Sequence, residues 1–136
     1  MSKIICIVDD QPALRQMLRL ALNFQGVAVI EAVDGADALD KIANHHVDMM
    51  IVDWQMPVMD GLELLRRLRK MDAYRDLPIL LVSCRDDLAA RQEARALGVV
   101  TWLKKPFRVS EVQAVVEHVL DLSGQDLLSK SVEGFG

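Results

Sequence analysis

Residues 49–53 of this chain read Met-Met-Ile-Val-Asp, and residues 54–57 read Trp-Gln-Met-Pro. Four consecutive apolar residues thus end at an aspartate, and a proline follows that could not continue a central strand. An apolar run this short, without polar alternation, is typical of a strand buried on both faces of a parallel sheet. The stretch therefore predicts a central strand of an α/β fold that ends at a carboxylate.

Four further runs of the same kind occur along the chain, with room for one helix between successive runs. They cover residues 4–8, 27–30, 79–82 and 99–103. The intervening segments repeat apolar residues at helical spacing, as Leu14, Met17, Leu18 and Ala21 do. Regular alternation of strand and helix predicts right-handed crossovers and a parallel sheet with helices on both faces.

Several polar residues predict where the helices begin. Asp34 is a candidate cap for the second helix, and Asp60 with Glu63 resembles a capping box for the third. We expect Ser110 with Gln113 to form the capping box of the fifth helix. The fourth helix, at about 87–97, is rich in alanine and buries little apolar area, so we expect it to be the least firmly docked.

Length and composition narrow the class of protein. The 136 residues, 51% of them hydrophobic, fit one globular domain, expected at 1–122 with a short flexible tail at 123–136. The net charge of -4 argues against direct nucleic-acid binding, and the longest apolar runs, about five residues, cannot span a membrane. Cys6 and Cys84 lie in apolar runs without CxxC spacing. We expect both to fill the core of a reduced, cytoplasmic protein.

Polar side chains follow four of the five apolar runs and should meet at the carboxyl edge of the sheet, where ligands bind in such folds. They are Asp9, Asp10, Asp53, Ser83 and Lys105. Carboxylates about 5 Å apart repel by roughly 3 kcal/mol per pair, which favours a hard dication, Mg2+ above all. A lysine and a hydroxyl suit phosphoryl oxygens, and an aspartate can itself attack phosphorus. The cluster predicts phosphoryl chemistry.

These motifs resemble those of the response-regulator receiver domain, the phosphorylatable module of two-component signalling. The matching stretches are Asp9-Asp10, residues 53–57 with Asp60-Gly61, Ser83, and Lys105-Pro106-Phe107. The resemblance covers about residues 3–121, and the spacings between the acidic, hydroxyl and lysine positions also agree. It implies a single doubly wound (βα)5 flavodoxin-like domain with the parallel strand order 2-1-3-4-5.

The resemblance implies a metal site and a phosphoacceptor. Asp53 would accept the phosphoryl group and also contact Mg2+. Asp10 would bind Mg2+ directly, and Asp9 directly or through water. The backbone carbonyl of Gln55 would complete the ligands that the protein supplies.

Further roles follow from the same resemblance. Ser83 would hydrogen-bond one phosphoryl oxygen and Lys105 would pair with another, with a cis peptide bond between Lys105 and Pro106. Trp102 lies where the family usually carries a switching Tyr or Phe, so Ser83 and Trp102 would form the switch. A tryptophan on an edge strand can also be ordinary packing, and that alternative stays open.

The resemblance also implies the function and the partners. A phosphohistidine on a sensor histidine kinase or a histidine phosphotransfer protein would donate its phosphoryl group to Asp53. The change would bias the fourth helix, fifth strand and fifth helix toward a downstream output protein or effector domain. The chain would catalyse only its own phosphorylation and dephosphorylation, without contacting nucleic acid or membrane.

Three alternatives remain at this point. A phosphatase of the haloacid-dehalogenase type also uses an aspartyl nucleophile, but it needs a second Asp where this chain has Gln55. A flavodoxin-like cofactor binder needs a phosphate-cradling loop after the first strand, where Asp9-Asp10 would repel the phosphate. Taken alone, Asp9 or Asp10 could simply cap the first helix.

Overall fold

Five strands alternate with five α-helices over residues 3–121, the part of the chain that the computed structural model describes. The elements are β1 (Ile4–Val8), α1 (Pro12–Asn23), β2 (Ala28–Ala32), α2 (Gly35–Asn44), β3 (Met49–Asp53), α3 (Gly61–Arg69), a 3-10 turn η1 (Asp72–Tyr74), β4 (Ile79–Ser83), α4 (Leu88–Ala96), β5 (Thr101–Lys104) and α5 (Val109–Leu120). The tail expected at 123–136 lies outside the described residues. Within residues 3–121, no helix combines the length and apolar character that crossing a bilayer requires.

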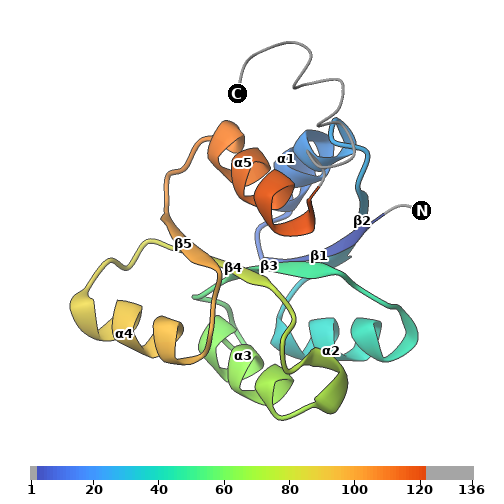
Figure 1. Cartoon of the computed structure of the whole chain (residues 1–136). Coiled ribbons are helices and arrows are strands. Elements are labelled where there is room, and N and C mark those ends of the chain that lie inside the picture. The colour runs from blue at the N-terminus through green and yellow to red at the C-terminus, as the bar shows by residue number, and fades with distance from the viewer. Residues whose placement is uncertain (1–2, 122–136) are drawn as a thin grey trace.

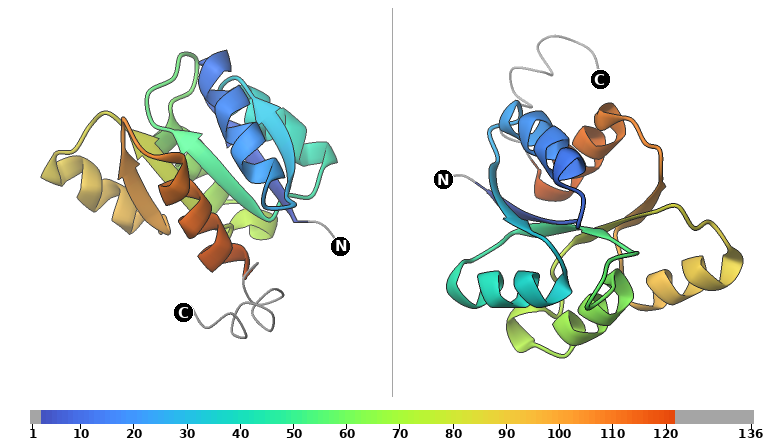
Figure 2. Two further views of the ribbon diagram at one scale, coloured as in Figure 1. Left: turned by 90° about the horizontal axis from the view of Figure 1, so that it is seen from above. Right: turned by 180° about the vertical axis from the view of Figure 1, so that it is seen from behind.

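The strands form one parallel sheet in the order β2-β1-β3-β4-β5, which confirms the predicted flavodoxin-like arrangement. Helices α1 and α5 cover one face of the sheet, and α2, α3 and α4 cover the other (Figures 1 and 2). Because β3 lies between β1 and β4, the carboxyl ends of these three strands are neighbours. The topology thereby brings together residues that are far apart in the sequence.

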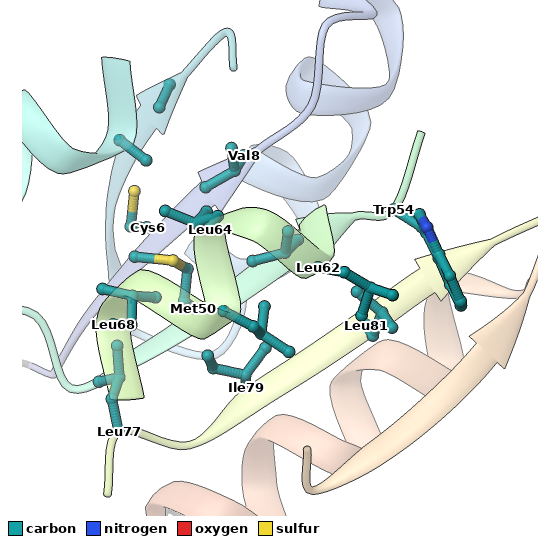
Figure 3. Close-up of a cluster of buried hydrophobic side chains, with 14 of the residues drawn as sticks. Cys6, Val8, Met50, Trp54, Leu62, Leu64, Leu68, Leu77, Ile79 and Leu81 are labelled. Carbon is teal, nitrogen blue, oxygen red and sulfur yellow. The ribbon is translucent and has the colours of Figure 1, made fainter. Parts of the chain in front are cut away.

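Each face of the sheet carries its own hydrophobic core. Alternate residues of a strand point to opposite faces. Met50 and Val52 therefore belong to the layer under α2, α3 and α4, whereas Met49 and Ile51 belong to the layer under α1 and α5. All five residues of β3 are buried, which explains the unbroken apolar run. Figure 3 shows α3 side chains packed on those of the strands, among them Leu62, Leu64, Leu68, Met50, Ile79 and Leu81.

The start of α5 differs from the expectation. The helix begins at Val109, and the Glu111 carboxylate accepts a hydrogen bond of 2.7 Å from the backbone N–H of Arg108. Ser110 therefore lies inside the first turn, and its predicted capping box with Gln113 is wrong. An acid near the positive end of the helix dipole stabilises the earlier start. The Gln113 side chain instead donates to the carbonyl of Ala21, on α1.

Other boundaries follow the sequence more closely. The side chains of Asp34 and Asp60 cap α2 and α3, accepting hydrogen bonds of 2.8 and 2.9 Å from backbone N–H groups. The fifth strand runs over 101–104 rather than 99–103. Cys6 is buried as expected, but Cys84 is exposed because it follows β4 in the loop toward α4.

A glycine at the start of α3 brings this helix against the end of β3. The Gly61 N–H donates to the carbonyl of Trp54 at 2.8 Å. A Cβ at Gly61 would lie 2.7 Å from the carbonyl oxygen of Asp53 and 2.9 Å from the Cα of Trp54. Only glycine permits so close an approach of helix and strand end, so Gly61 helps to position Asp53.

We expect Gly61→Ala to lower the free energy of unfolding by about 1–3 kcal/mol, because the added Cβ must displace the backbone beside Asp53. Gly35→Ala is the matched control, since both glycines open a helix directly after an aspartate cap. A Cβ at Gly35 would meet only the flexible side chain of Met59, at 2.8 Å, so its cost should be smaller. Urea melts of both variants measure the difference, and equal losses would contradict the explanation.

Candidate functional site

Three carboxylates meet at the carboxyl edge of the sheet. Asp9 follows β1, Asp53 ends β3, and these strands pair directly. One carboxylate oxygen from each of Asp9, Asp10 and Asp53 lies within 4.8 Å of the other two. Asp9 and Asp53 are only 1% and 5% exposed, whereas Asp10 is exposed. Two buried acids and one accessible acid therefore form a single acidic cluster.

Backbone contacts hold the two buried carboxylates. Asp9 Oδ1 accepts a hydrogen bond of 2.8 Å from the backbone N–H of Gln11, and the backbone N–H of Gln55 bonds the Asp53 carboxylate. Helix α1 begins at Pro12 after Gln11, without a side-chain cap. The alternative in which Asp9 or Asp10 caps α1 is therefore not what the structure shows.

One ammonium group faces the acidic cluster. Lys105 Nζ lies 3.4 Å from Asp9 Oδ2 and 3.4 Å from Asp53 Oδ1. The peptide bond between Lys105 and Pro106 is cis, as the resemblance implied. The backbone N–H of Lys105 donates to the carbonyl of Ser83 at 2.8 Å, which joins this loop to the end of β4. The side chain of Lys104 is exposed, and its nearest acid is Asp86, at 3.9 Å.

The electrostatics of the cluster leave it short of positive charge. Burial, and after it the nearby charge of Asp9, raise the pKa of the Asp53 carboxyl to about 6, although Lys105 opposes both effects. Burial also raises the pKa of Asp9, against hydrogen bonds from Gln11 and Lys105. A single ammonium group therefore does not balance the carboxylates.

The ligand atoms that the cluster offers suit a hard cation. They are carboxylate oxygens, and no histidine or cysteine belongs to this group among the described residues. Oxygen ligands of this kind are preferred by Mg2+, whereas zinc prefers nitrogen and sulfur. The residues present therefore fit Mg2+.

Ser83 and Gln55 lie beside the cluster in different surroundings. Ser83 ends β4 and is completely buried, and its Oγ accepts a hydrogen bond of 2.9 Å from the backbone N–H of Arg85. Gln55 follows β3 by two residues and is exposed. The Ser83 hydroxyl thus lies beside the buried acids, and among residues 3–121 it accepts this hydrogen bond without donating one.

An aromatic pair with an arginine borders the site, and sequence reasoning did not find this contact. The rings of Trp54 and Trp102 meet edge to face at 5.0 Å, and the guanidinium of Arg85 lies 4.6 Å from the centre of the Trp54 ring. Trp54 is 4% exposed and closes one end of the hydrophobic cluster (Figure 3). The three residues come from three separate segments, and no spacing in the sequence signals that they meet.

The switch role expected for Trp102 stays a prediction. Its ring packs on Trp54, as ordinary packing also would, and its Nε1 is buried without a hydrogen-bond partner among residues 3–121.

The raised pKa of Asp53 predicts how stability depends on pH in metal-free protein. Folded protein binds the Asp53 proton more tightly than the unfolded chain does. Stability should therefore fall as pH rises from about 4 to about 6. Asp53→Asn should remove this component and be more stable at pH 7 by on the order of 1–3 kcal/mol. Urea melts in chelator across this range measure it. Parallel pH profiles for the two proteins would show that Asp53 titrates normally.

Comparison with known proteins agrees with this geometry. The profile of the response regulator receiver domain matches residues 5–117. The chain is 40% identical over 122 residues to the response regulator MprA of Mycobacterium sp. (strain KMS), covering 90% of this chain and 52% of that protein. It is also 40% identical to the cyclic di-GMP phosphodiesterase response regulator RpfG of Xanthomonas campestris, covering 89% of this chain and 32% of RpfG. The chain thus spans about half the length of MprA and a third of RpfG.

Solved structures show the same fold over nearly their whole length. The chemotaxis protein CheY4 of Vibrio cholerae superposes with a TM-score of 0.82 at 33% identity, covering 88% of this chain and 99% of CheY4. A response regulator receiver protein from Pseudomonas putida superposes with the same TM-score at 27% identity, covering 87% of this chain and 98% of that one. With its profile match, its relatives and its strand order, the chain belongs to the response regulator receiver domain family, the phosphorelay module of two-component signalling.

Proposed function

We propose that this chain accepts a phosphoryl group on Asp53, with Mg2+, from a phosphohistidine on a sensor histidine kinase or a histidine phosphotransfer protein. The observation that carries the proposal is the placement of the Asp53 carboxylate. It is buried at the end of β3, beside the carboxylates of Asp9 and Asp10, and Lys105 Nζ lies 3.4 Å away.

The transfer is a displacement at phosphorus. A carboxylate oxygen of Asp53 attacks, and the bond between phosphorus and the donor nitrogen breaks. The donor nitrogen keeps the bonding electron pair and takes up a proton from solvent, so that a neutral imidazole leaves. The product is an acyl phosphate on Asp53. Burial raises the free energy of the ionised carboxylate, and its raised pKa is typical of groups that take part in chemistry.

Asp9, Asp10, Asp53 and the backbone carbonyl of Gln55 would hold the metal ion. When bound, Mg2+ neutralises charge on the carboxylates and on the phosphoryl oxygens. Of the three carboxylates, Asp10 is the one exposed to solvent.

Ser83 and Lys105 would contact the other phosphoryl oxygens. The Ser83 hydroxyl has a free proton to donate, and the Lys105 ammonium already lies between Asp9 and Asp53. Through Ser83 and Trp102 the added charge would bias the face formed by α4, β5 and α5 toward an output partner or effector domain.

The phosphatase alternative lacks support at a specific position. Gln55 carries a neutral amide where a haloacid-dehalogenase phosphatase needs a general acid, and its side chain is exposed. The chain would therefore catalyse only its own phosphorylation and dephosphorylation. An output activity, such as the one that the name of RpfG states, would belong to a longer protein.

Acetyl phosphate tests the proposal without a cognate kinase. With Mg2+, intact-mass spectrometry should show one added phosphoryl group on the wild type and none on Asp53→Asn. Asp60→Asn is the control, because Asp60 is an exposed carboxylate that only caps α3. It should label like the wild type. Undiminished labelling of Asp53→Asn would place the acceptor elsewhere.

In the acidic cluster, a change that raises the stability of the metal-free protein should at the same time weaken metal binding. Asp10→Asn keeps the side-chain shape and removes one repelling charge, so it should raise the urea midpoint in chelator by the equivalent of up to about 1 kcal/mol, since Asp10 is exposed. The same change removes a metal ligand, so the stabilisation by Mg2+ seen in the wild type should shrink or vanish.

Asp40→Asn matches the change in net charge at an exposed residue of α2 that does not belong to the acidic cluster, and it should do neither. Urea midpoints are measured for the wild type and each variant, in chelator and in Mg2+ at matched ionic strength. Each comparison with the wild type thus has four midpoints. A lower midpoint in chelator together with an undiminished gain from Mg2+ would make Asp10 a purely structural residue.

A further inference from the structure

Arg15, in the first turn of α1, is a mostly buried cation that contacts the backbone of the acidic cluster. Its Nη1 donates a hydrogen bond of 2.6 Å to the backbone carbonyl of Asp9. Its Nε pairs with Glu31 Oε1, at the end of β2, at 3.0 Å. The Arg15 side chain is only 13% exposed. One guanidinium therefore joins the residue that follows β1 to a residue near the end of β2.

Glu31 is held in turn by two other cations. Arg19 Nε lies 2.5 Å from Glu31 Oε2, and Lys41 Nζ donates to the carbonyl of Glu31 at 2.5 Å. With its carboxylate shared between two guanidinium groups, Glu31 fixes the direction of Arg15. Arg19 differs from Arg15 in one respect that matters here, because it makes no contact with Asp9.

The contact with the carbonyl of Asp9 completes the bonding of a buried residue. The N–H of Asp9 donates to the carbonyl of Ala32 at 3.1 Å, Oδ1 accepts from Gln11, and Oδ2 faces Lys105. The carbonyl oxygen has Arg15 as its partner. Without that partner a buried carbonyl would lose its hydrogen bond, and the peptide group could rotate to find another.

This peptide group is the one that links the two acidic residues. Rotation about it would change the direction in which Asp10 leaves the backbone. The side chain of Asp10 makes no hydrogen bond of its own within residues 3–121, so the backbone alone directs it toward the other two carboxylates. Mg2+ demands near-ideal octahedral geometry, so a ligand that is misdirected costs affinity.

We infer that Arg15 is a positioning residue for the metal ligands: by holding the Asp9–Asp10 peptide, it sets the direction of the Asp10 carboxylate. The inference rests on the proposed Mg2+ site. It makes Arg15 an outer partner of that site, at a position that contacts neither metal nor phosphoryl group. Loss of such partners typically weakens metal binding by 10–100-fold.

Calorimetric titration of the full chain with Mg2+ tests the inference under conditions where every protein is fully folded. Arg15→Met should weaken Mg2+ binding and so raise the dissociation constant about tenfold. Arg19→Met is the matched control, because it also removes one ion pair to Glu31 but leaves the Asp9 carbonyl bonded. It should bind Mg2+ within about twofold of the wild type.

A merely structural role for Arg15 would lower the urea midpoint of both variants and leave the dissociation constants alone, which would overturn the inference. Absence of Mg2+ binding to the wild type would instead reject the proposed metal site. Should Arg15→Met fail to fold, Arg15→Lys carries the same test. A single ammonium cannot reproduce the planar fork that bonds Glu31 and the Asp9 carbonyl together. An Arg15→Lys dissociation constant equal to that of the wild type would then overturn the inference.

Discussion

The burial of two neighbouring carboxylates, beside a third at one edge of the sheet, is the constraint on which the rest of this structure depends. Asp9 and Asp53 are buried side by side because β1 and β3 pair directly, and Asp10 adds a third charge within 4.8 Å. Burial and like charge raise the pKa of Asp53 to about 6 and also raise that of Asp9, so the ionised cluster lowers the stability of the fold at neutral pH. The surrounding fold must supply what this cluster takes away. Lys105 offsets part of the repulsion, and Gly61 lets the start of α3 pack directly against the end of β3.

Most of this arrangement could be predicted from the sequence, because few physical rules were needed. Continuous apolar runs indicate strands buried on both faces, and parallel strands bring their carboxyl ends to one edge. The polar residue after each run then had to lie near the others, whatever the side-chain details. The ends of the helices were harder to predict where neighbouring residues offer alternative caps. At α5, Ser110 and Glu111 both offer an N-terminal cap, and the structure uses Glu111.

The contacts that could not be predicted are those between side chains from separate elements. Arg15 lies six residues after Asp9, but only the crossing of α1 over the end of β1 brings its guanidinium to that carbonyl. Trp54 follows β3 and contacts Trp102 on β5, although β4 lies between these two strands in the sheet. Arg85 joins this contact from the loop after β4. Such contacts depend on helix docking angles and on rotamers, and neither leaves a period in the sequence.

Ser83 and Arg85 connect the acidic cluster to the start of α4. The Ser83 hydroxyl oxygen accepts from the Arg85 N–H, and the Arg85 guanidinium lies on Trp54 and bonds the Asp87 carboxylate. Asp87 also caps α4, through the N–H of the third residue of the helix. A hydroxyl can accept one hydrogen bond while it donates another. A donor bond from Ser83 toward Asp53 therefore does not require the bond from Arg85 to break. An unbroken series of contacts therefore joins Ser83 to the first turn of α4.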